Sequence, residues 1–252
     1  MNGFSGATIL VTGAASGIGA ATATALAARG PKKLILVDKD EEKLSDLGFT
    51  LPCERQPITG DVSDEGLWAA ADLTGLTHAV INAGVGEGKP IAETSLDDWR
   101  RVMAVNLDGA FLTLKAAMRA IRAGGRGGSI VLTASVAGFK AEPGIAAYGA
   151  SKAGVIQLTR VAAKEGAPDA IRVNAIAPGG VETPIWSNVP FFADLVRSSG
   201  SEAAAFKAAG SSTPLGRFAT ADEIAAQIAF LLSEDAGFVT GACLVSDGGY
   251  SL

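Results

Sequence analysis

Tyr148 and Lys152 stand four positions apart in the stretch AAYGASKAGV, and together these two side chains could move a proton. Positions i and i+4 of a helix lie on one face, so the phenol and the ammonium would be neighbours. Free tyrosine has a pKa of about 10, but a nearby cation stabilises the phenolate and lowers that pKa. The small surrounding residues leave room for a ligand, which makes Tyr148 a candidate acid–base group. A surface contact is nevertheless the commoner explanation for a Tyr–Lys pair on its own.

Ser135 is a second candidate for the same chemistry. It ends the apolar run SIVLTAS, thirteen residues before Tyr148, so a short loop could bring the two hydroxyls together. A serine there could hydrogen-bond the oxygen of a substrate alcohol or ketone, although a turn-forming serine fits the pattern equally well. Beside a dinucleotide, Ser135, Tyr148 and Lys152 would form a hydride-transfer site.

A glycine-rich stretch, VTGAASGIGAA, follows the first apolar run and opens an Ala-rich helical segment. Glycines here would permit a tight turn, the close approach of a ligand and close packing of helix on strand. The free N–H groups at the start of the helix would then face a pyrophosphate. The spacing G-x-x-x-G-x-G differs from the usual G-x-G-x-x-G, and glycines at such a turn need no ligand. Together with the proton-transfer residues, the loop predicts a dinucleotide site formed by Gly13, Ser16, Gly17, Ile18 and Gly19.

Asp38, at the end of the run LILVD, bears on the choice of coenzyme. A carboxylate at this position accepts hydrogen bonds from the adenosine ribose and repels a 2′-phosphate, which favours NAD over NADP. Two other interpretations stay open at this stage. Asp38 could instead cap the helix that begins near Asp40, and the cation of Lys39 could weaken the discrimination.

Two further strand ends carry residues that suit a dinucleotide. Asp61 could accept a hydrogen bond from the adenine amino group, and Val62 could stack on the adenine. The small residues of NAG would let the coenzyme come near. Each feature alone is typical of turns, but ligands bind at the carboxyl edge of open α/β sheets. The residues of NAG are Asn82, Ala83 and Gly84.

Apolar runs alternate with helical segments along the whole chain, which predicts an α/β fold. Near-continuous apolar runs are typical of strands buried on both faces, and βα alternation implies right-handed crossovers. We predict a Rossmann-like, doubly wound parallel sheet of about seven strands with helices on both faces. The run at 55–61 contains a proline and should form a shorter strand. The seven runs are 7–13, 32–38, 55–61, 77–84, 128–135, 171–179 and 242–249.

Helices are expected between these strands, and two of them have clear capping signals. Ser95 with Asp98 begins a long helix that reaches about Arg122, and Thr220 with Glu223 begins another. The apolar stripe of the second helix consists of Ile224, Ile228, Leu231 and Leu232. Further helices are expected at 17–29, 40–48 and 147–166.

Residues 183–214 break this rhythm, because they contain no clear strand. We expect a mobile loop there, with one or two short helices over the site. Since nothing marks a linker, residues 1–252 are predicted to form a single domain with this segment as its lid. The aromatic residues of the segment favour an apolar or aromatic substrate, or else they pack the lid onto the body; they are Trp186, Phe191, Phe192 and Phe206.

Composition excludes several other classes of protein. The net charge is −5 and the basic residues are scattered, which argues against a nucleic-acid partner. Cys53 and Cys243 lie far apart and His78 is the only histidine, so no metal site is predicted and His78 is expected to be an ordinary strand-end residue. The first residues do not resemble a secretory signal, and no apolar run approaches about 20 residues, so a cytoplasmic protein without membrane contact is expected.

Several of these motifs together resemble the short-chain dehydrogenase/reductase family in its single-domain form. They are TGAASGIG at 12–19, NAG at 82–84, Asn106, Ser135, YGASK at 148–152 and PGGVET at 178–183. The motifs are individually modest, but their order and spacing are jointly specific, and the resemblance covers nearly the whole chain.

The resemblance implies a role for each matched residue. Tyr148 would be the catalytic acid–base and Ser135 the donor that polarises the substrate. Lys152 would lower the pKa of Tyr148 and bind the nicotinamide ribose, and Asn106 would hold a water molecule that links Lys152 to solvent. Such proteins are usually homotetramers. Residues expected along the nicotinamide are Pro178, Gly179, Val181 and Thr183.

The predicted function is the NAD-dependent, reversible oxidation of a secondary alcohol to a ketone. One alternative is the reduction of 3-oxoacyl thioesters on an acyl carrier protein, which usually requires NADPH and is therefore opposed by Asp38. The other alternative is a catalytically idle protein that senses NAD. The complete set of Ser135, Tyr148, Lys152 and Asn106 argues against a sensor, which needs no proton-transfer residues.

Overall fold

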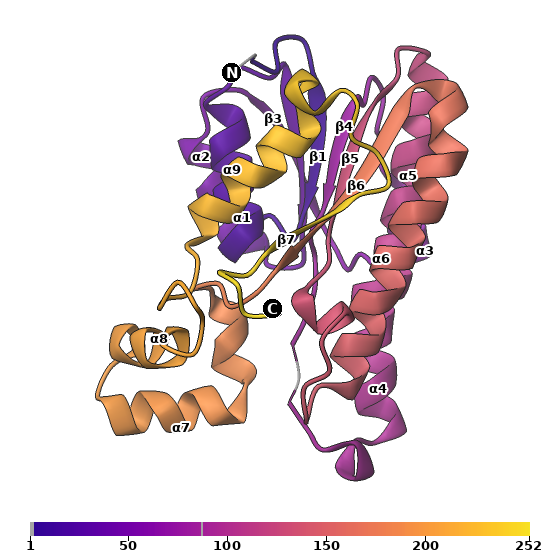
Figure 1. Cartoon of the computed structure of the whole chain (residues 1–252). Coiled ribbons are helices and arrows are strands. Elements are labelled where there is room, and N and C mark those ends of the chain that lie inside the picture. The colour runs from indigo at the N-terminus through magenta and orange to yellow at the C-terminus, as the bar shows by residue number, and fades with distance from the viewer. Residues whose placement is uncertain (1–2, 87) are drawn as a thin grey trace.

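The computed structural model describes residues 3–86 and 88–252, and it contains one sheet of seven parallel strands in the order β3-β2-β1-β4-β5-β6-β7 (Figure 1). The sheet and its strand number confirm the prediction. The reversal of order between β1 and β4 opens a crevice at the carboxyl ends of these two strands. The strands are β1 (Thr8–Thr12), β2 (Lys33–Asp38), β3 (Glu54–Thr59), β4 (His78–Ile81), β5 (Gly128–Thr133), β6 (Ile171–Pro178) and β7 (Cys243–Ser246).

The expectation of a short strand around Pro57 is wrong. β3 is six residues long and pairs with β2 along its whole length, with Pro57 opposite Leu36. β3 lies at the edge of the sheet and has a strand on one side only. A proline costs no ladder hydrogen bond when its nitrogen faces the open edge, so the strand can continue through it.

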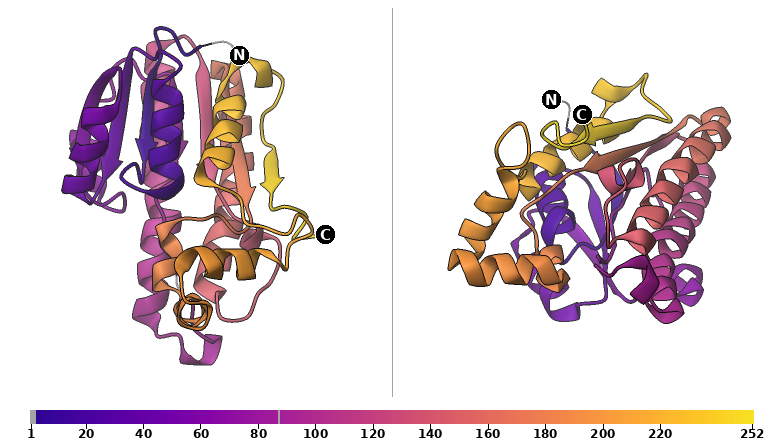
Figure 2. Two further views of the ribbon diagram at one scale, coloured as in Figure 1. Left: turned by 90° about the vertical axis from the view of Figure 1, so that its left-hand side faces the viewer. Right: turned by 60° about the horizontal axis from the view of Figure 1, so that its bottom comes forward.

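Helices cover both faces of the sheet, as predicted (Figures 1 and 2). The first face carries α1 (Gly17–Ala27), α2 (Glu41–Thr50) and α9 (Ala221–Leu232), and the second carries α3 (Glu65–Ala70), α5 (Gly109–Gly124) and α6 (Ala146–Gly166). The short α3 is not among the predicted helices. None of the helices within 3–86 and 88–252 has the length and apolar character needed to cross a membrane.

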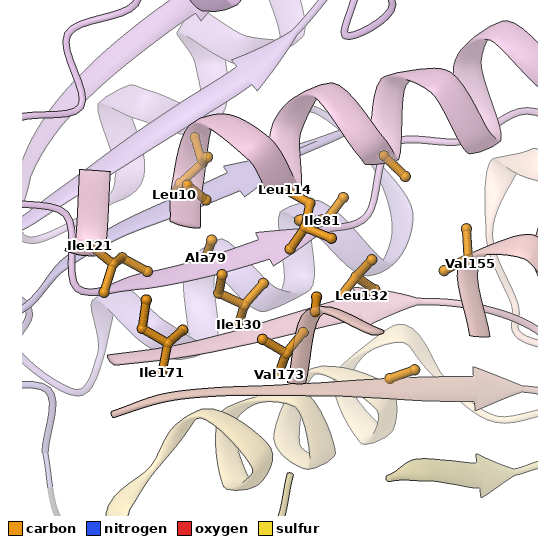
Figure 3. Packing of buried hydrophobic residues seen from close by; sticks show 14 of the residues in the cluster. Leu10, Ala79, Ile81, Leu114, Ile121, Ile130, Leu132, Val155, Ile171 and Val173 are labelled. Carbon is orange, nitrogen blue, oxygen red and sulfur yellow. The ribbon is translucent and has the colours of Figure 1, made fainter. Parts of the chain in front are cut away.

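Alternate residues of each strand supply the two cores. Leu10 of β1 packs with α5 and α6, whereas its neighbours Ile9 and Val11 pack with α1 and α9. Successive side chains of a strand point to opposite faces, so a central strand needs apolar residues at every position. Figure 3 shows the core between the sheet and the helices α5 and α6, where Ile130 and Leu132 of β5 lie beneath Leu114 of α5.

Both predicted capping boxes are present. The side chains of Ser95 and Thr220 accept from the backbone N–H groups of Asp98 and Glu223, whose carboxylates bond back. The long helix that Ser95 opens is interrupted, however. α4 (Leu96–Met103) passes into the π-helical turn η2 (Ala104–Asp108) before α5 begins, so the prediction of one regular helix is wrong at this point.

The segment 183–214, called the lid segment below, carries two helices at the carboxyl end of the sheet (Figures 1 and 2). These are α7 (Pro190–Ser199) and α8 (Glu202–Gly210), preceded by the 3-10 helix η5 (Pro184–Asn188). The other 3-10 helices are η1 (Ile91–Glu93), η3 (Val136–Gly138), η4 (Ala167–Asp169) and η6 (Glu234–Ala236).

Candidate active site

A cavity of about 360 Å³ lies at the carboxyl edge of the sheet, where β1 and β4 part. It extends from Asp38 at one end to Ser135 and Tyr148 at the other, so one space joins the predicted coenzyme loop to the predicted catalytic residues. Sixteen of the predicted coenzyme residues line it: Gly13, Ser16, Gly17, Ile18, Asp38, Asp61, Val62, Asn82, Ala83, Gly84, Tyr148, Lys152, Pro178, Gly179, Val181 and Thr183.

Glycine is required at two positions of the first loop for different structural reasons. Gly13 has a φ of +64°, and a Cβ there would lie 2.8 Å from the Cα of Ala83, so only glycine fits between the ends of β1 and β4. Gly19 lies behind the cavity, and a Cβ on it would meet the carbonyl oxygen of Gly13 at 1.9 Å. Gly19 therefore lets α1 pack against the loop, which is the packing role that the sequence predicts for one of the glycines.

Asp38 faces the cavity and does not cap α2. One carboxylate oxygen accepts from the backbone N–H of Ala15 at 2.9 Å, and the other accepts from that of Asp40 at 3.1 Å. The N-cap of α2 is Asp40, whose side chain accepts from the N–H of Lys43. Asp38 thus ties the glycine loop to the end of β2, and Lys39 lies beside it in the cavity wall.

The ends of β3 and β4 are held by their own hydrogen bonds. Asp61 accepts from the backbone N–H of Ser63 at 2.9 Å and from its hydroxyl at 2.7 Å, and these bonds lower the pKa of the carboxyl. The side-chain N–H groups of Asn82 reach the carbonyls of Thr12 and Gly13, at 3.3 and 3.4 Å. Asn82 therefore fixes the loop after β1 from the neighbouring strand.

Tyr148 and Lys152 rise from the first two turns of α6, and the ammonium lies over the phenol ring, 5.6 Å from its centre. Lys152 is buried and donates a hydrogen bond of 2.8 Å to the carbonyl oxygen of Thr133 at the end of β5. A Cβ on Gly84 would lie 3.6 Å from the Lys152 nitrogen, so this glycine keeps space open beside the cation. The amine is thus directed toward the ring, as the proposed chemistry requires.

The groups of the chain by themselves raise the pKa of Tyr148. Burial raises it above the ordinary value, and the hydrogen bond with Ser135 opposes this rise only in part. Burial also lowers the pKa of Lys152 to about 8, since removing the ammonium from water disfavours its charged form. The predicted lowering of the Tyr148 pKa combines the charge of Lys152 with that of an oxidised nicotinamide, and it stays a prediction. At 5.6 Å, the cation does not compensate for the dehydration of the phenol.

Asn106 lies at the centre of the π-helical turn and is buried behind the cavity. Its carbonyl oxygen accepts from the N–H of Val85 at 2.8 Å, and its amide N–H donates to the carbonyl of Val85 at 2.9 Å and to the hydroxyl of Ser151 at 3.3 Å. Both polar ends of the side chain are therefore occupied by the chain itself. The amide holds the segment after β4 against α6, one residue from Lys152.

Comparison with known proteins identifies the family. Residues 13–251 match the family model described as Enoyl-(Acyl carrier protein) reductase. The chain is 40% identical to cis-4-hydroxycyclohexanecarboxylate dehydrogenase of Sinomonas cyclohexanicum, covering 96% of this chain and 95% of the relative. It is 35% identical to cyclohexanol dehydrogenase of an Acinetobacter species, over 99% and 97% of the two chains.

Solved structures agree with these matches. Levodione reductase superposes with a TM-score of 0.87 at 34% identity, over 98% of both chains. A short-chain type dehydrogenase/reductase from Mycobacterium marinum superposes with a TM-score of 0.86 at 30% identity, over 99% and 97% of the two chains. This chain belongs to the short-chain dehydrogenase/reductase family. Family membership confirms the prediction of an oxidoreductase that acts on CH–OH groups with a nicotinamide coenzyme.

The lid aromatics of this dehydrogenase/reductase divide between packing and the cavity. Phe192 and Phe206 are buried against each other, with ring centres 4.6 Å apart, so they form the core of the lid segment. Trp186 stacks on Phe218 at 5.3 Å and lines the cavity. Phe191 is exposed. Packing is thus the correct interpretation for Phe192 and Phe206, and only Trp186 of the four reaches the site.

Several lining residues of this dehydrogenase/reductase are not among those predicted from sequence. Val85 and Ile185 line the same cavity as Tyr148, and a Cβ on Gly86 would lie 3.3 Å from Ile185. The segment after β4 and the lid segment therefore meet across the site. Sequence could have indicated Val85, since it directly follows NAG, but Ile185 carries no local signal because its place depends on the lid.

Proposed function

We propose that this short-chain dehydrogenase/reductase uses NAD(H) to interconvert an uncharged alicyclic secondary alcohol and its ketone, with Ser135, Tyr148 and Lys152 as catalytic residues. The observation that carries the proposal is the position of the Tyr148 phenol. It lies between the Ser135 hydroxyl and the Lys152 ammonium, at the end of a cavity whose other end is formed by the glycine loop. Hydride-transfer chemistry needs this combination of a proton-transfer group and a coenzyme site in one space.

The residues of the cavity fit a dinucleotide. Gly13, Gly17 and Gly84 border it without side chains, and a Cβ on Gly17 would lie 3.3 Å from Thr183 of the lid segment. The glycine loop would hold the pyrophosphate at the start of α1, and Asp38 would hold the adenosine ribose. When bound, the nicotinamide supplies the acceptor and donor of the hydride. Lys152 would bind the nicotinamide ribose.

Tyr148 would take the proton of the substrate alcohol, and Ser135 would hold the substrate oxygen. The Ser135 hydroxyl accepts from the backbone N–H of Ala137 at 3.2 Å, which orients it at the end of β5. Burial makes the phenolate costly, so the charge of Lys152 and that of an oxidised coenzyme must together lower the pKa of Tyr148 during turnover. Asn106 would act from behind, by fixing Val85 and Ser151; its predicted part in a water relay remains a proposal.

NAD is proposed as the coenzyme because Asp38 presents a carboxylate where a 2′-phosphate would have to lie. The two backbone N–H groups that Asp38 accepts hold its carboxylate in place at the cavity wall. Repulsion between this charge and a phosphate would disfavour NADP. The ammonium of Lys39 lies in the same wall and reduces this discrimination without reversing it, since Asp38 is the residue that the loop orients.

The proposed substrate class follows from the apolar residues that line the cavity together with Tyr148. Val85, Ile185 and Trp186 are apolar, and the indole N–H of Trp186 already donates to the carbonyl of Val181 at 2.8 Å. A substrate carboxylate placed there would lose its hydration without gaining a cationic partner among the described lining residues, because Lys152 is engaged beside Tyr148. Relatives named for cyclohexanol and hydroxycyclohexanecarboxylate support a six-membered ring.

An alcohol panel tests this function. With NAD, cyclohexanol and 4-methylcyclohexanol should be oxidised, and 4-hydroxycyclohexanecarboxylate should have a kcat/KM at least about tenfold lower, as expected for an unpaired buried charge. Tyr148→Phe should lower kcat by about 10³-fold or more and leave NADH binding intact. Turnover of acyl thioesters instead of cyclic alcohols would favour the carrier-protein reductase, and NADH binding without any turnover would favour a sensor.

We further propose that residues 1–252 act as one domain in a cytoplasmic homotetramer, with the lid segment over the site. Apolar side chains on the open edge of the sheet support the oligomer. Leu244 and Val245 of β7 and Phe230 of α9 are exposed, and exposed apolar surface of this kind is typical of subunit contacts.

A further inference from the structure

The last residues of the chain contact three separate segments near the active-site cavity, one of which lines it at Gly179. Residues 247–252, called the C-terminal turn, follow β7 at the end of the sheet where α7 and α8 lie (Figures 1 and 2). Just before the turn, the carbonyl of Ser246 accepts from the N–H of Gly179 at 3.0 Å. Within the turn, the carbonyl of Gly248 accepts from the N–H of Leu215 at 3.1 Å, directly after the lid segment. The turn thus contacts the segment after β6 and the end of the lid.

The third contact is a cluster of three side chains, Lys140, Glu142 and Tyr250. The Tyr250 hydroxyl donates to a carboxylate oxygen of Glu142 at 2.5 Å, and this bond lowers the pKa of Glu142, which therefore stays ionised near neutral pH. The Lys140 ammonium lies 3.2 Å from the same oxygen, 3.6 Å from the centre of the Tyr250 ring and 3.3 Å from the Tyr250 carbonyl. One aromatic residue therefore joins a cation and an anion of a distant loop.

That loop connects the two proposed catalytic hydroxyls. It spans residues 136–147, between Ser135 and Tyr148. The N–H of Lys140 donates to the carbonyl of Val136 at 2.8 Å, so Lys140 belongs to the turn that Ser135 begins. A shift of Lys140 would therefore be transmitted to Ser135 through four residues of hydrogen-bonded backbone.

The turn itself is rigidly built. Asp247 accepts from the N–H of Gly249 at 2.9 Å and from that of Ser251 at 2.7 Å, one bond to each carboxylate oxygen. A Cβ on Gly179 would lie 2.8 Å from the Cβ of Asp247, so the turn packs directly behind the segment predicted to lie along the nicotinamide. Tyr250 is thereby presented from a fixed base.

We propose that Tyr250 is a positioning residue for the alcohol–ketone reaction. Through Glu142 and Lys140 it holds the loop 136–147 against the C-terminal turn, and the turn of that loop at Lys140 fixes Ser135 in the cavity wall. The inference rests on the proposed function for its substrate, although the contacts of Tyr250 stand independently of that function. Tyr250 acts through the loop and does not touch the reacting atoms.

Tyr250→Phe tests the proposal, because it keeps the ring over Lys140 and removes only the bond to Glu142. KM for cyclohexanol should rise about fivefold while kcat changes less than about twofold, as for a lost hydrogen bond that positions a ground-state contact. The NADH dissociation constant, measured by fluorescence, should stay unchanged. Amide hydrogen exchange of residues 139–145 should become about fivefold faster, while exchange in β4 stays the same.

Three further variants make the result specific. Glu142→Gln keeps an acceptor for the Tyr250 hydroxyl and should restore most of the substrate affinity that Glu142→Ala loses. Asp169→Asn breaks a comparable surface ion pair with Arg122. This pair lies just before β6, at the amino ends of the strands and away from the site, so the variant should change none of these quantities.

The proposal is overturned if Tyr250→Phe leaves both KM and the exchange of the loop unchanged. It is also overturned if NADH binding weakens by the same factor as substrate binding, which would indicate general destabilisation. A wild-type protein that oxidises no alcohol would refute the proposed function, whereas the exchange measurement would still decide the role of Tyr250.

Discussion

At the scale of single residues, the candidate site depends on the charge states of two side chains, Tyr148 and Lys152. Lys152 is buried and Tyr148 is half-buried, and dehydration moves both pKa values toward the neutral forms, upward for the phenol and down to about 8 for the ammonium. With a pKa of about 8, the Lys152 amine still carries its charge at pH 7, but this charge, 5.6 Å from the centre of the phenol ring, does not offset the dehydration of the phenol. Activity therefore requires additional positive charge in the cavity, which an oxidised nicotinamide would bring.

The choice of coenzyme belongs to the same scale and is decided by one carboxylate. Asp38→Asn keeps an oxygen that can accept from the N–H of Ala15, but it removes the negative charge. The ratio of kcat/KM for NAD to that for NADP should fall about tenfold or more, which corresponds to about 1.4 kcal/mol. Asp40→Asn, which alters the cap of α2 two residues later, is the matched control and should leave the ratio unchanged. An unchanged ratio in Asp38→Asn would mean that this carboxylate does not select the coenzyme.

At the scale of elements, the close approach of α1 to β1 makes the coenzyme site. Gly19→Ala would place a methyl group 1.9 Å from the carbonyl oxygen of Gly13 and 2.7 Å from its carbon, both backbone atoms that cannot rotate away. Unfolding in urea should show a loss of about 3 kcal/mol, and NADH binding should weaken strongly. Gly124→Ala, at the end of α5, meets only the carbonyl oxygen of Leu76 at 4.0 Å and should be neutral or slightly stabilising. Equal stability of the two variants would refute this account of Gly19.

At the scale of the whole molecule, His78 links the stability of the fold to pH. It lies at the amino end of the central strand β4, whereas the site lies at the carboxyl ends of the strands. It begins β4, as the sequence predicts for an ordinary strand-end histidine, with its ring against Phe4 and its Nδ1 2.8 Å from the Thr77 hydroxyl. Burial lowers its pKa from 6.5 to about 4, so the folded protein holds the neutral ring. Its contribution is present above pH 6.5 and is lost as the pH falls toward 4, because the unfolded chain takes up the proton first.

The full loss is about 3.5 kcal/mol of unfolding free energy, from 2.5 pKa units at about 1.4 kcal/mol each, and about 3 kcal/mol of it should be reached at pH 4, where the folded ring is half protonated. Urea denaturation of the wild type and of His78→Gln at pH 7 and pH 4 measures it. The acid destabilisation of His78→Gln should be smaller than that of the wild type by this amount, since the carboxylates contribute to both. Parallel curves for the two proteins would show that His78 does not titrate in this way.

Most of the fold and the chemistry could be predicted because they depend on local pattern. Most strands are apolar runs, the edge strand β3 being the polar exception, and residues such as Asp38 and Ser135 close their runs at the carboxyl ends of the strands, where topology must bring them together. The short α3 escapes prediction because EGLWAA is too brief to show a periodic stripe. The π-helical turn at Asn106 escapes for another reason, since it accompanies bonds to Val85 and Ser151 that are distant in sequence.

The sequence by itself determined the parallel sheet and indicated the candidate coenzyme loop and the candidate proton-transfer residues, because these follow from periodicity and from side-chain chemistry. Only the tertiary structure decided which lid aromatics reach the cavity, that Asp38 holds the glycine loop, and that the C-terminal turn is bonded to the loop 136–147. It also decided that burial raises the pKa of Tyr148 in the chain by itself. The physical reason is that burial and long-range packing depend on segments far apart in the chain, whereas local propensity and residue chemistry do not.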